Sequence, residues 1–199
     1  MLSRGFTLLE VLVTLVILMF GLLGLAGLMA KGQRASHEAY QRQQALSLAS
    51  DIGERVRTNS GSALLYAAAA PLLTPLGAGA RYALIGTTVT NCAAPAANCT
   101  AAQLVDYDTA LWDGALSGAS EVDVATATSI GGIQGARGCI VDTGQAVGTT
   151  MTARVLRISI AWQGRDATVA NPVSTCGNGQ FGNENLRRVV TLDVLMLNP

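Results

Sequence analysis

The sequence lacks the residues from which most catalytic and metal sites are built. It holds one histidine, His37, and contains no G-x-S-x-G, H-E-x-x-H or phosphate-binding glycine loop. The spacing of its cysteines matches no common zinc pattern, because no C-x2-C occurs and His37 lies far from all of them in sequence. We therefore expect no enzyme activity, no metal site and no cofactor.

Clustered basic charge is also missing. Lys31 is the only lysine, the arginines stand singly or in pairs, and 13 basic residues balance 13 acidic ones. A nucleic-acid-binding protein needs a basic patch or stripe for the phosphate backbone. The charge pattern therefore argues against a nucleic-acid partner.

The most informative feature that is present is an apolar run near the amino terminus. The stub Met1–Gly5 is followed by Phe6-Thr7-Leu8-Leu9-Glu10 and by apolar residues up to Ala30, with Glu10 as the only charge in the run. A helix of roughly 20 apolar residues crosses a bilayer. The stub is too short to be a secretory signal with its own apolar core. We predict a membrane-spanning helix over residues 6–30. Because a charge at mid-bilayer costs about 3 kcal/mol, Glu10 should have a specific role.

This arrangement resembles the leader of a type IV prepilin. The short basic stub, Gly5-Phe6 and a Glu five positions after the Gly all precede a spanning helix. The resemblance implies that residues 1–5 are a leader, that a prepilin peptidase cuts after Gly5 and methylates the new amine of Phe6, and that Glu10 guides subunit assembly. A carboxylate one helical turn from that amine can pair with it or with the amine of the next subunit. An unpaired charge in a low-dielectric core is strongly penalised, so the pairing would set the register between subunits.

The cysteines indicate an oxidising compartment. All four lie beyond the apolar run, at Cys92, Cys99, Cys139 and Cys176. An even number, with two close together, is typical of two disulfides. Three pairings are possible, and we favour Cys92–Cys99 and Cys139–Cys176.

The charges that flank the apolar run give a conflicting orientation. Arg4 and the amino terminus lie on one side, and Lys31, Arg34 and Arg42 lie on the other. Taken alone, the positive-inside rule would place the carboxyl-terminal part in the cytoplasm. The cysteines and the prepilin resemblance favour the opposite. We expect a single-pass inner-membrane protein with a periplasmic carboxyl-terminal domain, incorporated into the extracellular pilus.

The helix is predicted to continue past the membrane over residues 31–60. No proline occurs from Lys31 to about Asn59, good helix formers dominate, and turn formers follow at Thr58–Ser62. We interpret the charges of Asp51–Arg57 as a solvated helix face.

Glycines at 21, 24, 27 and 32 leave two interpretations of this helix open. In the first, the small residues allow close packing between helices in the membrane. In the second, they mark a weak point where the helix can loosen.

Residues 61–136 predict a variable connecting region with two helices. A short helix at Ala63–Ala70 should end at Pro71, and Thr100 should cap a second helix that runs to about Leu116. In the second helix we expect Leu104, Tyr107, Leu111 and either Trp112 or Ala115 to face one way, with Asp106 and Asp113 facing another.

Residues 137–199 predict an antiparallel sheet with a disulfide-stapled loop. A short strand at Gly138–Val141 is followed by two alternating segments, Arg154–Trp162 and Leu186–Leu197. In the first of these, Leu156, Ile158, Ile160 and Trp162 should face one way and Arg157 and Ser159 the other. A long amino-terminal helix packed on a small antiparallel sheet is an α+β fold.

Further stretches resemble the PilV type of minor pilin. They are residues 48–59, Cys99 before Ala102–Leu104, Asp108 followed by Trp112, and residues 158–162. The family's usual Leu-Pro-Gly-Gly segment is here only Ile130-Gly131-Gly132.

This second resemblance implies a minor subunit of the type IV pilus. Such a subunit helps to start or cap the fibre and so contributes to twitching motility and surface attachment. The implied partners are other minor pilins, the major pilin, the prepilin peptidase, the inner-membrane assembly platform and the lipid bilayer. Two alternatives are a minor pseudopilin of a type II secretion system and a membrane-anchored adhesin that acts through the loops between Gly164 and Asn185.

Overall fold

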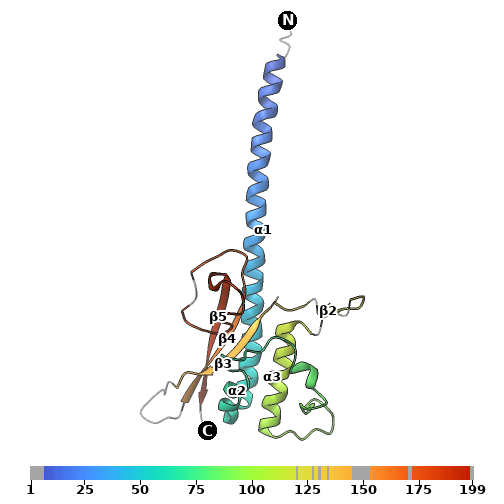
Figure 1. The fold of residues 1–199 in the computed structure, drawn as a ribbon, viewed down its shortest axis with the longest axis vertical. Helices are drawn as coiled ribbons and strands as arrows, with labels where there is room; N and C mark the ends of the chain where they lie inside the picture. The colour runs from blue at the N-terminus through green and yellow to red at the C-terminus, as the bar shows by residue number, and fades with distance from the viewer. Residues whose placement is uncertain are drawn as a thin grey trace. The chain divides into compact units, whose positions relative to one another are not determined.

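The computed structural model describes residues 7–119, 121–126, 128–129, 131–133, 135–144, 153–169 and 172–197 (Figure 1). The chain divides into two compact units, Met1–Tyr40 and Gln41–Pro199. The described part of the first unit is helical, and the second unit combines helices with sheet.

Helix α1 runs from Leu8 to Thr58 and contributes to both units. No proline interrupts it, and the backbone N–H of Asn59 still bonds to the carbonyl of Arg55 at 3.2 Å where it ends. The two helical segments predicted over residues 6–30 and 31–60 therefore correspond to the single helix α1. Two short helices follow directly, η1 (Ser60–Ser62) and α2 (Ala63–Ala69), and α2 ends before Pro71, which cannot donate a backbone hydrogen bond.

The second unit contains a three-stranded antiparallel sheet in the order β3-β4-β5. Its strands are β3 (Arg137–Asp142), β4 (Ala153–Gln163) and β5 (Arg187–Leu197). The register places Ile140 and Leu192 on either side of Ile158. The long apolar amino-terminal helix and the small antiparallel sheets confirm the predicted α+β class.

The carboxyl-terminal part of α1, from Gln41 to Thr58, packs against one face of this sheet. Ala45, Ala49, Ile52 and Val56 are fully buried. At Gly53 the approach is so close that an added Cβ would lie 3.3 Å from Cγ2 of Val194 and 3.5 Å from Cδ1 of Ile158. Small residues on this face of α1 let the helix lie directly on the strand side chains.

Helix α3 (Ala101–Ser117) begins at the predicted cap but buries a different face from the one expected. Thr100 and Gln103 form a reciprocal capping box. The buried stripe runs through Val105, Trp112 and Leu116. Tyr107 and Leu111 are only half-buried, so the expected apolar face was wrong.

Asp113 shows most clearly why the expected faces of α3 were wrong. It was expected on a polar face, but it is 2% exposed. Its carboxylate accepts hydrogen bonds from the backbone N–H groups of Gly77 and Arg81. Burial of a carboxylate is stable when backbone donors satisfy it, and the loop that supplies them precedes the short helix η2 (Tyr82–Leu84).

Ser159 on β4 is a second correction. It was expected to face away from the core, yet it is fully buried. The loop that contains Ser174 and Cys176 covers this second face of the sheet, and the Ser174 hydroxyl lies 2.9 Å from that of Ser159. Arg157, which was predicted to share that face, remains partly exposed and binds both carboxylate oxygens of Asp193 at 2.8 Å.

The structure also contains elements that the sequence did not predict. Strands β1 (Val122–Asp123) and β2 (Thr128–Ser129) pair as a small antiparallel sheet, and η3 (Glu184–Leu186) precedes β5. A strand of two residues is too short to show an alternating pattern.

Candidate functional site

The first turn of α1 carries the carboxylate that the sequence singles out. Thr7 stands immediately before the helix, and its carbonyl accepts the backbone N–H groups of Glu10 at 3.0 Å and of Val11 at 3.3 Å. Its hydroxyl lies 3.3 Å from the Glu10 nitrogen. Glu10 is thus held in the first turn with its side chain exposed, where the positive end of the helix dipole favours a negative charge.

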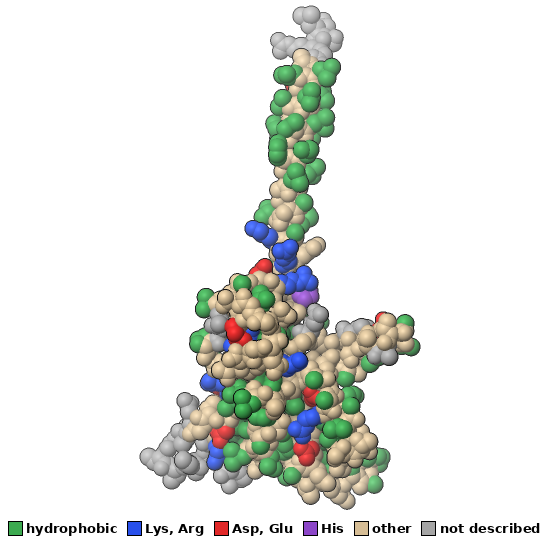
Figure 2. Space-filling view, in the orientation of Figure 1, with side chains coloured by type: hydrophobic (Ala, Val, Ile, Leu, Met, Phe, Trp, Pro, Cys, Tyr) green, Lys and Arg blue, Asp and Glu red, His purple; other side chains and the backbone are tan. Residues whose placement is uncertain are grey.

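The helix beyond Glu10 exposes apolar side chains on all sides. An 18-residue window of α1 has a mean hydropathy of 2.7 and is 0% buried within the chain, so by length and composition it can cross a membrane. Leu8, Phe20 and Leu28 are 82%, 65% and 69% exposed. Figure 2 shows apolar side chains along this segment. A surface of this kind needs lipid or other apolar helices around it.

The glycines of this segment leave both earlier interpretations open. The helix continues through Gly21, Gly24, Gly27 and Gly32, and an added Cβ at any of them would meet nothing within 4 Å. They form small notches on the helix surface. The predicted cleavage and methylation positions, Gly5 and Phe6, lie outside the described residues.

In the second unit, a polar network joins α1 to α2 and α3. Asp108 is 5% exposed; it accepts a hydrogen bond from the Tyr66 hydroxyl at 2.6 Å and one from the Arg55 guanidinium at 3.1 Å. The same guanidinium contacts Asp51 at 3.1 Å. Burial, together with the hydrogen bond to Asp108, raises the pKa of Tyr66 well above its ordinary value.

The solvated-face interpretation of Asp51–Arg57 is correct for most of these residues but misses Arg55. Asp51, Glu54 and Arg57 are exposed, whereas Arg55 reaches Asp108 on α3. A signal was present in the sequence. Asp108 lies three residues after Val105 and four before Trp112, on the stripe that α3 buries, and a buried carboxylate needs a partner.

Trp112 adds a second link between these helices. Its indole Nε1–H donates to the carbonyl of Leu48 at 3.1 Å. The bulky side chain is fully buried, and Gly138 on β3 approaches its ring so closely that an added Cβ would lie 2.4 Å from it. Helix α3 is thus held between α1 and β3.

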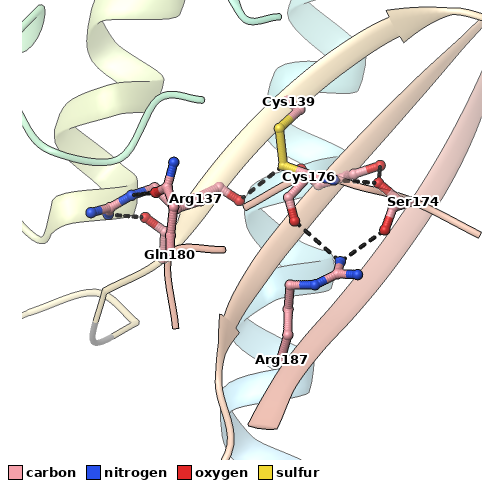
Figure 3. The surroundings of a disulfide bond; sticks show 8 residues. Arg137, Cys139, Ser174, Cys176, Gln180 and Arg187 are labelled. Carbon is pink, nitrogen blue, oxygen red and sulfur yellow. Dashed lines mark hydrogen bonds between the residues drawn. A yellow bond between two sulfur atoms is a disulfide. The ribbon is translucent and has the colours of Figure 1, made fainter. Parts of the chain in front are cut away.

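The structure joins the same cysteine pairs that we favour from the sequence. Cys92 bonds to Cys99 and Cys139 to Cys176, with Sγ–Sγ distances of 2.01 and 1.96 Å. The second disulfide is buried and connects β3 to the loop before β5 (Figure 3).

A buried guanidinium supports that loop. Arg187, which is 4% exposed, donates to the carbonyls of Ser174 at 2.8 Å and Cys176 at 3.2 Å (Figure 3). It also pairs with Glu184 at 2.6 Å. A hydrogen bond from the Gly179 backbone, followed by the bond from Arg187, lowers the pKa of Glu184.

A polar pocket of about 460 Å³ lies beside this loop. Its lining includes Arg137, Gln163, Arg165, Gln180 and Phe181. Within the described part of the chain, no group of three or more His, Cys, Asp or Glu residues is arranged to hold a metal ion.

Comparison with known proteins matches two family models to this chain. Residues 1–26 match the prokaryotic N-terminal methylation motif, and residues 28–110 match the model described as type IV pilin Tt1218. The first match contains Glu10, and the second contains Arg55, Tyr66 and Asp108. No curated protein and no solved structure matches the chain.

The type IV pilin family is structural and is not an enzyme family. It implies assembly with other pilins, and the methylation motif implies processing by a prepilin peptidase. The motif and the long apolar helix fit a membrane-anchored pilin. Together the two matches support a type IV pilin, with the α+β arrangement of that fold.

Proposed function

We propose that this chain is a minor, PilV-type pilin that helps to start or cap a type IV pilus and thereby supports twitching motility and surface attachment. The observation that carries the proposal is Glu10. It is the only charge between Leu8 and Ala30 in an exposed apolar helix, and it lies five positions after Gly5, where cleavage is predicted. A carboxylate in such a helix is costly unless it is paired, and assembly with other subunits can supply the pairing group.

Assembly transfers the apolar segment of α1 from lipid into a bundle of similar helices. Lipid tails and packed helices are comparably apolar, so the transfer alone favours no particular stagger between subunits. Glu10 supplies that preference by pairing with the free amine of Phe6, in its own chain or in a neighbour. Removal of residues 1–5 is required first, because it creates the amine.

The proposed location follows from the cysteines. Two disulfides are stable in the periplasm and are rare in the cytosol. The second unit is therefore periplasmic before assembly, and residues 6–30 of the first unit lie in the inner membrane. After assembly the subunit is part of the extracellular fibre.

The amino terminus of fibre-borne protein tests this proposal. Sheared pili should contain a chain that begins at a methylated Phe6, as read by mass spectrometry. Gly5→Trp should leave an uncut precursor that stays in the membrane fraction. The proposal fails if chains that retain Met1 are found in functioning fibres.

A minor pseudopilin of a type II secretion system would use the same helix and carboxylate. A deletion strain separates the two roles. Loss of surface pili with secretion intact supports the pilus, and loss of secretion with pili intact supports the pseudopilin.

The pocket beside the stapled loop favours a second candidate function, an adhesin. Gln163 and Gln180 contribute amides, and Arg137 and Arg165 contribute guanidiniums, to the lining of this pocket. Arg165→Ala with Gln163→Ala should then reduce attachment by cells whose fibres are normal in number. Unchanged attachment would remove the adhesin role.

A further inference from the structure

We propose that Lys31 and Arg34, with His37 beside them, form a basic collar on α1 that binds anionic phospholipid headgroups at the membrane surface. The inference rests on the proposed membrane-anchored pilin and assigns a ligand to residues just outside its apolar segment.

The position of the collar matches the thickness of a bilayer. At about 1.5 Å per residue, the helix rises about 31 Å from Glu10 to Lys31. The hydrocarbon core of a bilayer is about 30 Å thick. When Glu10 lies at one edge of the core, Lys31 therefore lies at the other, and the next two turns enter the headgroup layer.

The side chains of the collar are available to lipid. Lys31, Arg34 and His37 are all exposed. Residues three apart on a helix are displaced by about 60° around the axis, so the three cover a wide arc over about 9 Å of rise. Tyr40 follows one turn later and is 65% exposed. Aromatic rings with a polar tip are enriched at this depth.

The charge of the segment complements an anionic surface. Glu38 is the one acidic residue between Glu10 and Asp51. Neither Lys31 nor Arg34 takes part in an ion pair with any residue that the structure describes. Figure 2 shows basic side chains gathered just beyond the apolar segment. Long cationic side chains can extend to headgroup phosphates while their stems stay against apolar surface.

The collar also accounts for the conflict in the flanking charges. Basic residues on the periplasmic side oppose the positive-inside rule. Headgroup binding gives them a function there, because it fixes the depth of the helix until the subunit is drawn into a fibre.

The test measures lipid preference around the intact chain. The full chain is reconstituted in phosphatidylcholine vesicles that contain spin-labelled phosphatidylglycerol or spin-labelled phosphatidylcholine. The fraction of label immobilised by the protein gives the preference. We expect the anionic lipid to be favoured about threefold to tenfold at low salt. In about 1 M salt, where the Debye length is about 3 Å, the preference should disappear.

Matched variants assign the preference to the collar. Lys31→Gln and Arg34→Gln should each reduce the preference about twofold to threefold, and together they should bring it close to one. Arg57→Gln is the control, because it removes the same charge from an exposed position on α1 outside the collar. Equal binding of the two lipids by the wild-type chain would overturn the inference. So would a preference that survives the double substitution.

Alkaline carbonate extraction of the same vesicles separates the two proposals. A chain that remains in the vesicles but shows no preference overturns the collar alone. A chain that is washed out overturns the membrane anchor and the collar together.

Discussion

Asp108 is the residue on which the packing of α1 against α3 most depends. It accepts hydrogen bonds from Tyr66 and Arg55 while almost fully buried. Asp108→Ala leaves the buried Tyr66 hydroxyl without its acceptor and the Arg55 guanidinium with Asp51 alone, so we expect a loss of about 2–3 kcal/mol in the free energy of unfolding. Denaturant unfolding of the full chain in detergent micelles measures it.

Asp106 on the same helix provides the control. It pairs with Arg81 at 2.7 Å, but its side chain is 55% exposed. Asp106→Ala should therefore cost less than about 1 kcal/mol. Equal losses for the two variants would show that the buried carboxylate contributes no more to stability than the exposed one.

Tyr66 gives the network a characteristic pH dependence. Its pKa in the folded chain lies above the ordinary value of 10.0, first because it is buried and then because it donates to Asp108. A group whose pKa is raised by folding stabilises the fold below its unfolded pKa and loses that contribution as pH rises. The free energy of unfolding should therefore fall above about pH 10. In the Tyr66→Phe variant it should fall less steeply with pH. Identical slopes for the two proteins would contradict this.

At the scale of single elements, the two disulfides close loops of different length. Cys139–Cys176 spans 37 positions and Cys92–Cys99 spans 7. Loop-closure entropy predicts about 4 kcal/mol for the longer loop and about 2.5 for the shorter. Replacing Cys139 and Cys176 with Ala should lower unfolding stability more than the same change at Cys92 and Cys99. The reverse order, measured by denaturant unfolding, would contradict the entropic account.

The sequence predicted the elements better than it predicted their faces. Proline-free helix formers, the Thr100 cap and alternating strands are local signals, and α1, α3, β4 and β5 begin and end near the expected residues. The burial of Asp113 and Ser159 depends on loops that arrive from elsewhere in the chain. Periodicity within one element cannot show which loop will cover it.

The candidate functional residues likewise fall into those that the sequence reveals and those that only the structure brings together. Glu10 stands out in the sequence because a charge in an apolar run needs no tertiary information to be noticed. The Arg55–Asp108–Tyr66 network joins residues that are far apart in sequence. Its members were visible only as separate polar residues until the helices were placed together.

The whole molecule combines two units of different kinds. The first presents an apolar helix with a carboxylate in its first turn, and the second is a disulfide-linked α+β domain whose core includes the end of that helix. The central claim is that Glu10 selects the stagger of the subunit when the helix leaves lipid for the fibre.

The amount of Glu10→Gln protein in sheared pili, relative to the membrane fraction, tests this claim most directly. Glutamine keeps the size of the side chain and removes its charge, while Glu10→Asp keeps the charge and serves as the control. We predict that the Gln variant is cleaved after Gly5 but is nearly absent from fibres, with the Asp variant retaining part of the wild-type level. Incorporation of Glu10→Gln at the wild-type level would contradict the account.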